Sequence, residues 1–239
     1  MASQQSAASA PSRKPVVLCL SEFPPFNASS LPEGGPLARV VAQAFARVGL
    51  RTELRFLPWA RVLKEAEAGE CLIAGLWRSE ARDQIYAYAR PVFRMELGYF
   101  GLRSAERPGE SVSESVASRI CVQRGAYLPP ALTPIQNQLQ AHTDMPGCMR
   151  MLEKGRVDIA FGARGAGQHY LDSQAGRDLQ NSIEWKGPPL EVKEHLLAVR
   201  STHPERELLL QSFNRGLGLL QADGSYQRLL KAGGITPPP

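Results

Sequence analysis

The 239-residue sequence lacks the features that would place it in several simple classes. It has no run of about eighteen apolar residues, so we expect no membrane-spanning helix. It has no Cys-x-x-Cys pair and its four histidines stand apart, which argues against a metal site. The net charge is +5, but Lys and Arg never form a run of five and no groove-reading motif accompanies them, so nucleic-acid binding is not expected.

The beginning of the chain shows no secretory signal. Residues 1–14 are polar and low in complexity, without a basic start or an apolar core. Ala8-Ser9-Ala10 is similar to the end of a cleavage site. The segment is therefore interpreted either as the trimmed remainder of an export signal or as a leader, and we expect it to be flexible.

Cysteines are few, and they divide evenly between the two halves of the chain. Cys19 and Cys71 lie in the first half, and Cys121 and Cys148 in the second. An even number permits the bridges Cys19–Cys71 and Cys121–Cys148, which is one of three formal pairings. The sequence alone favours the other interpretation, in which the cysteines of predicted strands are small buried hydrophobic residues.

What the sequence does contain is 43% hydrophobic residues, enough for a core, in an alternation of strand and helix patterns. The predicted strands are 16–20, 51–57 and 71–76, and the helices between them are 36–48 and 58–68. This order requires parallel strands with right-handed crossovers, so the loops after the first and third strands share one edge of the sheet. Phe23 and Trp77 should therefore face one another.

Part of this pattern is repeated in the second half. Glu67-Ala-Gly-Glu-Cys-Leu-Ile-Ala-Gly returns as Glu153-Lys-Gly-Arg-Val-Asp-Ile-Ala-Phe-Gly, each copy leading from a helical pattern into a short strand and then into arginines. The repeat predicts two α/β lobes with a cleft between them, the first formed by 15–103 plus 190–239 and the second by 104–189. Two connecting strands would form a hinge.

Further elements are expected along both lobes. They are a strand at 95–102, a crossover at 104–118, a strand at 120–125, helical patterns at 136–140 and 148–154, a strand at 157–161, a return crossover at 185–189, a strand at 194–200 and helices at 204–220 and 226–231.

Seven short motifs occur in a characteristic order. They are Glu22-Phe-Pro-Pro-Phe26, Leu57-Pro-Trp-Ala-Arg61, Trp77-Arg-Ser-Glu-Ala-Arg82 leading to Tyr88-Ala-Arg-Pro-Val-Phe93, Val122-Gln-Arg-Gly125, Leu152-Glu-Lys-Gly-Arg-Val-Asp158, Leu197-Ala-Val-Arg200, and Phe213-Asn214 with Ala222-Asp-Gly-Ser-Tyr226. From about Pro15 to Ile235 the chain resembles the periplasmic solute-binding proteins of extracellular family 3, which bind polar amino acids for ABC importers.

This resemblance implies a fold, a location and partners. The fold would be the α/β, two-lobed type II periplasmic-binding-protein fold, in which each lobe is a mostly parallel sheet flanked by helices and two crossover strands act as the hinge. The protein would be a periplasmic monomer without a cofactor, would bind a small molecule, and would deliver it to the membrane permease of an ABC importer.

The resemblance also implies ligand contacts in the first lobe. Arg82 would hold the ligand's carboxylate through paired hydrogen bonds, which guanidinium geometry allows. Its alternative is a surface salt bridge to Glu80 or Asp83. The implied wall residues are Phe23, which would stack against the ligand, and Trp59, Leu76 and Trp77; for Trp59 the alternative is packing in the core.

In the second lobe, backbone amides of Gly125-Ala126-Tyr127 would complete the carboxylate site. The family usually has Ser or Thr where this chain has Ala126, so Tyr127 or backbone amides alone must supply the contact. The family's aspartate, which pairs with a ligand ammonium, is replaced here by Ala163, and Arg164 follows it.

Without that aspartate an ammonium group would be unpaired in a closed cleft, so binding of an ordinary α-amino acid is in doubt. If Arg164 points inward, it and Arg82 suit a dianion such as a dicarboxylate, or an aromatic carboxylate resting on Phe23 and Trp77. Alternatively, Arg164 is a solvated loop residue. Independently of Arg164, Glu22 of the first lobe is a candidate to replace the missing acid.

Three functions therefore remain open. The first is a non-enzymatic binding protein for a small carboxylate. The second is a lyase similar to the cyclohexadienyl dehydratases, for which Glu22 and Glu80 are the only nearby candidates for a general acid. The third is a ligand-sensing module of a membrane signalling protein.

Overall fold

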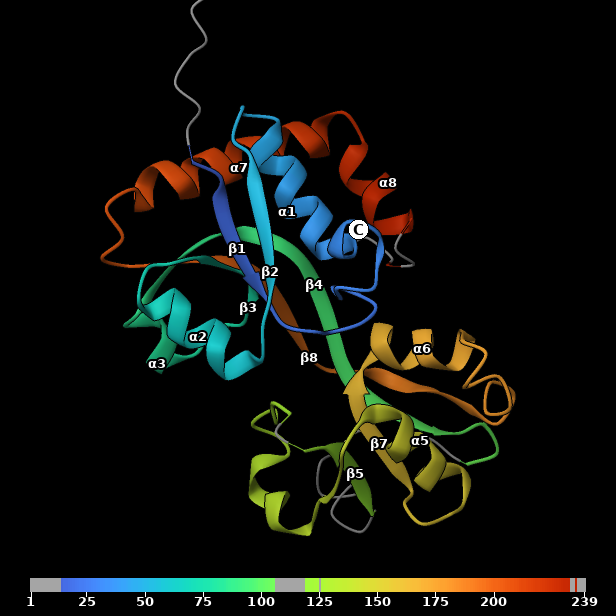
Figure 1. Cartoon of the computed structure of the whole chain (residues 1–239). Helices are drawn as coiled ribbons and strands as arrows, with labels where there is room; N and C mark the ends of the chain where they lie inside the picture. The colour runs from blue at the N-terminus through green and yellow to red at the C-terminus, as the bar shows by residue number, and fades with distance from the viewer. Residues whose placement is uncertain (1–13, 106–118, 125, 233–234, 236–239) are drawn as a thin grey trace, which may run out of the picture.

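Eight strands form one sheet that passes through both lobes of the molecule (Figure 1). The computed structural model describes residues 14–105, 119–124, 126–232 and 235. Within them the strand order is β2-β1-β3-β8-β4-β7-β5-β6. Residues 1–13 of the predicted leader, most of the predicted crossover at 104–118, and Gly125 lie outside the described residues.

The first lobe is built on the predicted alternation of strands and helices. β1 (Val16–Leu20) pairs in parallel with β2 (Thr52–Phe56) and β3 (Leu72–Leu76). Helix α1 (Pro36–Ala46) buries an apolar stripe that includes Val40 and Phe45. The predictions for these strands and for α1 and α2 (Trp59–Glu67) are confirmed to within two residues at each boundary.

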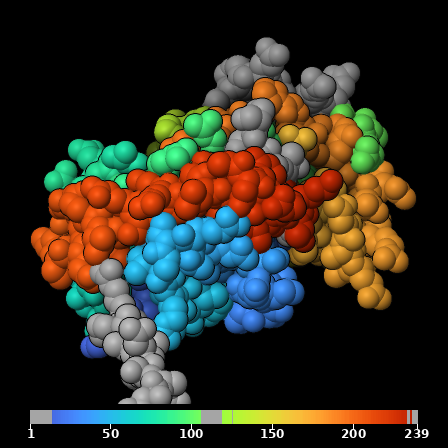
Figure 2. Space-filling view, turned by 90° about the horizontal axis from the view of Figure 1, so that it is seen from above, coloured from blue at the N-terminus to red at the C-terminus, as the bar shows by residue number. Residues whose placement is uncertain are grey.

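Helices cover both faces of this part of the sheet. Helix α1 packs with α7 (Arg206–Ala222) and α8 (Ser225–Ala232), and α2 packs on the other face together with the short α3 (Glu80–Asp83) (Figure 1). Viewed from above, α7 and α8 spread over this end of the first lobe (Figure 2). None of the helices in the described part of the chain is long and apolar enough to cross a membrane.

The second lobe repeats the parallel pairing. β5 (Ile120–Gln123) pairs with β6 (Gln140–His142) and with β7 (Ile159–Ala163), and the helices are α5 (Met145–Glu153) and α6 (Arg164–Asp172). The helical pattern predicted at 136–140 is wrong in type and extent, because this segment is a 3-10 helix, η2 (Thr133–Gln138), followed by β6. From Gln140 the chain pairs with β5 instead of continuing a helix, and the prolines at 129, 130 and 134 disfavour a helix that begins further upstream. Helix α6 was not predicted.

Two long strands connect the lobes. β4 (Tyr86–Leu102) and β8 (Ile183–Arg200) pair antiparallel from one end to the other, and they run side by side from the upper lobe into the lower one (Figure 1). β8 pairs with β3 in the first lobe, and β4 pairs with β7 in the second. The prediction of two crossover strands is confirmed, but their positions differ from the predicted crossovers at 104–118 and 185–189. The first crossing is made by β4, which extends the strand predicted at 95–102, and residues 185–189 lie within β8, which extends the strand predicted at 194–200. The lobe boundaries at 103/104 and 189/190 stay a prediction.

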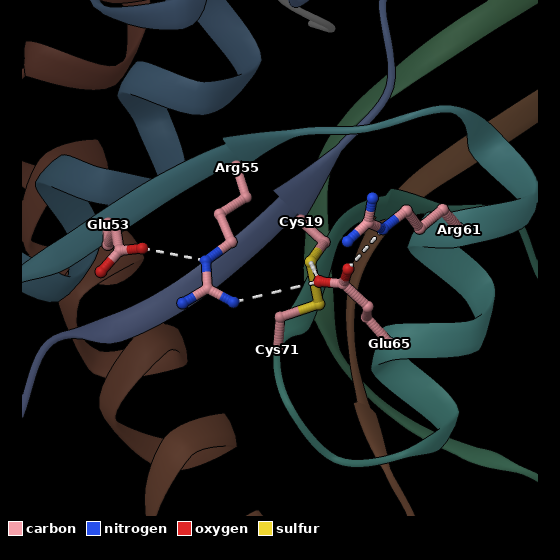
Figure 3. Close-up of a disulfide and its surroundings, with 6 residues drawn as sticks. All are labelled: Cys19, Glu53, Arg55, Arg61, Glu65 and Cys71. Carbon is pink, nitrogen blue, oxygen red and sulfur yellow. Dashed lines mark hydrogen bonds and ion pairs between the residues drawn. A yellow bond between two sulfur atoms is a disulfide. The ribbon is translucent and has the colours of Figure 1, made fainter.

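Each lobe contains one disulfide. Cys19–Cys71 joins β1 to the start of β3, and Cys121–Cys148 joins β5 to α5. All four cysteines are buried, as expected for the strand residues Cys19, Cys71 and Cys121, but the interpretation of these as unpaired hydrophobic residues is wrong. Figure 3 shows Glu65 beside the first disulfide, with its carboxylate 2.9 Å from the Arg61 guanidinium.

Candidate functional site

A cluster of aromatic rings surrounds His195 where the hinge meets the first lobe. His195 on β8 is the register partner of Phe93 on β4, and their rings stack with centroids 4.5 Å apart. Phe23 and Phe26, from the loop after β1, stack near the same imidazole at 6.1 and 6.2 Å. His195 is only 2% exposed, so it forms the floor on which the cluster is built.

Trp77 is held in place by a hydrogen bond to this histidine. Its indole Nε1 donates to His195 Nε2 over 2.8 Å, with the two rings edge to face. An indole N–H can only donate, so Nε2 is unprotonated and the proton of the neutral imidazole lies on Nδ1, for which the described part of the chain offers no hydrogen-bond partner. Burial lowers the pKa of His195 to about 3, so the side chain is neutral.

A glycine makes room for this arrangement. Gly75 in β3 has φ +104, and a Cβ there would lie 3.2 Å from His195 Nδ1 and 2.8 Å from the Leu37 side chain. The structure thus brings Phe23 and Trp77 onto two sides of one imidazole, one stacked and one edge-on.

Arg82 lies beside this cluster in the short helix α3. Ser79 caps the helix by accepting the Arg82 amide, and the Arg82 guanidinium donates to the Trp77 carbonyl oxygen over 2.8 Å. The guanidinium also lies 5.7 Å from the centroid of the Trp59 ring, which is 38% exposed and so not part of the core. Asp83 pairs with Arg78 instead, and among the described residues no carboxylate forms an ion pair with Arg82.

The second lobe reaches this wall through Tyr127. Its ring meets Trp77 edge to face at 5.6 Å, and its hydroxyl donates to the Glu191 carboxylate over 3.0 Å. Lys193 pairs with the same carboxylate at 2.7 Å, and its Nζ lies 4.0 Å from the centroid of the Tyr127 ring. An aromatic contact therefore links the lobes, and charged residues of the hinge strand support it.

A cavity of ≈ 420 Å³ opens along the same stretch of β8. It is lined by Arg78, Arg94, Glu191, Val192, Lys193, Glu194 and Leu196. β3 pairs with β8 only at Leu196–Ala198, so the part of β8 that precedes Leu196 has, among the described residues, no strand paired to that edge between the lobes. The cavity adjoins the cluster through Arg78, the residue after Trp77, and through Glu191 and Lys193.

Other predicted site residues lie elsewhere or are already engaged. Arg164 is the first residue of α6, pairs with Glu96 at 2.9 Å and lies over the Trp185 ring, with 53% of its side chain exposed. It is therefore not a loop residue, and its charge has an acidic partner other than a ligand. Ala163 is buried at the end of β7.

Glu22 and Leu76 also have other surroundings. Glu22 is exposed and its carboxylate accepts the Ser29 amide. Leu76 is fully buried in a cluster with Cys19 and Val62, so its side chain is closed to a ligand. Ala126 is exposed, and Gly125 lies outside the described residues.

Sequence reasoning missed the hinge residues Glu191, Lys193 and His195. Their common signal is alternation: every second residue of one strand is polar, and the last of the three is a histidine at the start of an apolar run. That alternation puts the three side chains on one face of β8, toward the cluster.

No protein-family model matches the chain, and no curated protein matches it in sequence. Solved structures do match. The sensor domain of a histidine kinase with similarity to periplasmic binding proteins has a TM-score of 0.74 at 20% identity, covering 94% of this chain and 98% of that one.

Two other matches are a substrate-binding protein of an ABC transporter and a domain of BvgS. The amino acid ABC transporter substrate-binding protein AbpA from Streptococcus pneumoniae, bound to L-arginine, has a TM-score of 0.69 at 14% identity, covering 92% of this chain and 93% of that one. The VFT2 domain of BvgS from Bordetella pertussis has a TM-score of 0.68 at 18% identity, covering 91% and 92%. At these identities the matches show the fold, and the prediction of a two-lobed periplasmic-binding-protein fold is confirmed.

Proposed function

We propose that this protein binds a small carboxylate-bearing ligand between its lobes and does not act as an enzyme. Arg82 carries the proposal. Its guanidinium is fixed by the Trp77 carbonyl and the face of Trp59, and it has no acidic partner among the described residues. A guanidinium stays charged at any physiological pH, and a ligand carboxylate would supply the counter-charge through a pair of hydrogen bonds.

Apolar parts of the ligand would rest on the rings beside Arg82. Trp77, Phe23 and Tyr127 offer faces and edges within one cluster. Aromatic walls with few polar groups are typical of small-molecule sites. Because Arg164 already pairs with Glu96, we propose a ligand that needs one guanidinium rather than two.

The binding step would shift the balance between open and closed lobes. Trp77 belongs to the first lobe and Tyr127 to the second, so a ligand touching both gains its full contacts only when the lobes are together. The paired strands β4 and β8 are the elements on which this motion would occur.

We further propose that the protein is a periplasmic monomer that delivers its ligand to the permease of an ABC importer. Two buried disulfides support an oxidising compartment. A sensing module for a membrane signalling protein is the second candidate, because the matching structures include the sensor domain of a histidine kinase. Neighbouring genes distinguish the two roles: a permease and an ATPase support transport, and a signalling partner supports sensing.

The lyase alternative finds less support in the geometry. Its general acid requires a carboxyl group held against the leaving group with a raised pKa. Glu22 and Glu80 are both exposed, and Glu22 accepts a backbone amide.

A thermal-shift screen tests the proposal. The ligand-stripped protein would be melted with amino acids, dicarboxylates, polyamines and aromatic carboxylates, alongside Arg82→Ala and the control Arg177→Ala, an exposed arginine of the second lobe. A ligand at about 100 times its Kd stabilises the native state by about 2.7 kcal/mol, which raises Tm by about 5–10 °C. We expect this shift in the protein and the control, but not in Arg82→Ala. An equal shift in Arg82→Ala would refute a carboxylate site at Arg82.

A further inference from the structure

Lys193 already occupies a cation site beside the proposed ligand site. Its ammonium lies 4.0 Å from the centroid of the Tyr127 ring and 2.7 Å from a Glu191 carboxylate oxygen. An aromatic face together with a carboxylate is the combination that binds ammonium groups in proteins. The Tyr127 hydroxyl donates a hydrogen bond to the same carboxylate, so the aromatic ring and the acid that surround the ammonium are also fixed to each other.

The cation site is largely enclosed and borders open space. The side chain of Lys193 is 15% exposed and that of Glu191 25%, and both line the ≈ 420 Å³ cavity along β8. Burial lowers the pKa of Lys193, but Glu191 and Tyr127 raise it by more, so the net shift is upward and the group stays protonated.

Other carboxylates around the hinge are engaged as well. Glu194 pairs with Arg94, Glu96 pairs with Arg164, and Glu22 accepts the Ser29 amide. At Glu191, Glu194 or Glu96 an entering ammonium group would have to displace a charge of the protein itself, whereas Glu22 is held by a neutral backbone amide.

We propose that Lys193 is a specificity-determining residue: its tethered ammonium fills the subsite made by Tyr127 and Glu191, so the cleft selects carboxylates that carry no ammonium group. This inference rests on the proposed function and narrows its substrate class. Removal of the Lys193 charge should leave Glu191 unpaired in a partly buried site, which favours ligands that bring an ammonium of their own.

The cation subsite is tested first, without any carboxylate ligand. Lys193→Ala removes the propylammonium part of the side chain, so the probe is n-propylammonium chloride, with sodium chloride at the same concentration as the salt control. We expect the probe to raise the Tm of Lys193→Ala by about 3 °C. It should not raise the Tm of the unaltered protein, of Lys64→Ala, an exposed lysine on α2, or of Lys193→Ala/Glu191→Gln, which lacks the carboxylate.

Ligand selection is tested second, by calorimetry with two pairs that differ in one ammonium group: hydrocinnamate with L-phenylalanine, and glutarate with L-glutamate. The unaltered protein and Lys64→Met should prefer the member without the ammonium. Lys193→Met keeps an apolar side chain but has no charge. In this variant the Kd of the amino acid divided by the Kd of its partner without the ammonium should fall about tenfold or more.

The outcomes separate the inference from the function on which it rests. Rescue by propylammonium without binding of any carboxylate would support the subsite and refute the proposed carboxylate function. Carboxylate binding with no rescue and an unchanged Kd ratio in Lys193→Met would overturn the role of Lys193 and leave the proposed function standing. A preference of the unaltered protein for the amino acids would also overturn it.

Discussion

Mild acid should destabilise this protein through His195. The imidazole is neutral and buried in the folded state, where its pKa is about 3, whereas in the unfolded chain it has the ordinary value of 6.5. Below 6.5 the unfolded chain binds a proton that the folded protein does not, so stability falls as pH decreases from 6.5 toward 3. Because of this difference in pKa, the free energy of unfolding should be lower by about 2 kcal/mol at about pH 5. It should be lower by about 4–5 kcal/mol once His195 is protonated in both the folded and the unfolded state.

Urea unfolding at about pH 7 and about pH 5 measures this loss. The reference variant is His195→Phe, which keeps an aromatic ring stacked on Phe93 but cannot titrate. Loss of the Trp77 hydrogen bond lowers the stability of the variant equally at both pH values, so it does not enter the comparison. Aspartates with lowered pKa, such as Asp158 and Asp223, lose their contribution below the usual 3.8 and thus outside this interval.

We expect the free energy of unfolding to fall by about 2 kcal/mol more in the unaltered protein than in His195→Phe. Equal losses in both proteins would refute a neutral, buried His195 and, with it, the assignment of Nε2 as acceptor for Trp77. The same measurement therefore tests how the tryptophan of the ligand site is held.

Two further predictions concern stability. Gly216→Ala should lower the free energy of unfolding by about 2 kcal/mol or more, because the added Cβ would lie 1.8 Å from the Ala44 carbonyl oxygen where α7 crosses α1. Its control is Gly218→Ala, two residues further along α7, where the added Cβ would have only the Arg90 side chain nearby, 4.0 Å away. This variant should raise the free energy of unfolding by about 0.5–1 kcal/mol. Urea midpoints that shift in the same direction would contradict the close helix contact. Replacing both Cys19 and Cys71 by Ala opens a loop of 52 residues and should cost about 4 kcal/mol; a change in Tm below that expected for about 1 kcal/mol would show that the bridge does not restrict the unfolded chain.

Local patterns were enough to predict the first lobe. β1, α1, β2 and α2 are short, their apolar periods are clear, and glycines follow the helices, so their boundaries could be predicted to within two residues. Helix α6 gave no such signal, because glycines weaken its pattern. Gly167 is nevertheless required for packing, since a Cβ there would lie 2.3 Å from the Phe100 ring.

The long strands could not be predicted, because prolines interrupt them. Pro91 lies inside β4 at a register shift, and Pro188 and Pro189 lie inside β8. A proline in a run of residues usually argues against a strand, but an irregular ladder accommodates it. The segments on either side therefore seemed separate in sequence.

The candidate site also contains some residues whose positions could be predicted from the sequence and others whose positions could not. Phe23 and Trp77 lie in the loops that follow β1 and β3, and Arg82 lies in α3 just beyond Trp77, so their place at one sheet edge follows from topology. Lys193 and His195 depend on the register of β8 against β4, which joins residues about a hundred positions apart. No local pattern contains that register, and so the cation site and the histidine floor emerge only from the folded structure.

The full-length pairing of β4 and β8 has a mechanical consequence. Sliding one strand past the other would break several ladder hydrogen bonds at about 0.5–1.5 kcal/mol each, whereas bending the ribbon out of its plane keeps them. The pair of strands therefore resists sliding of one strand along the other but bends more easily out of its plane. We expect the proposed motion of the lobes to occur mainly by bending of this ribbon, and a pair of distance labels, one on α1 and one on α5, would measure it.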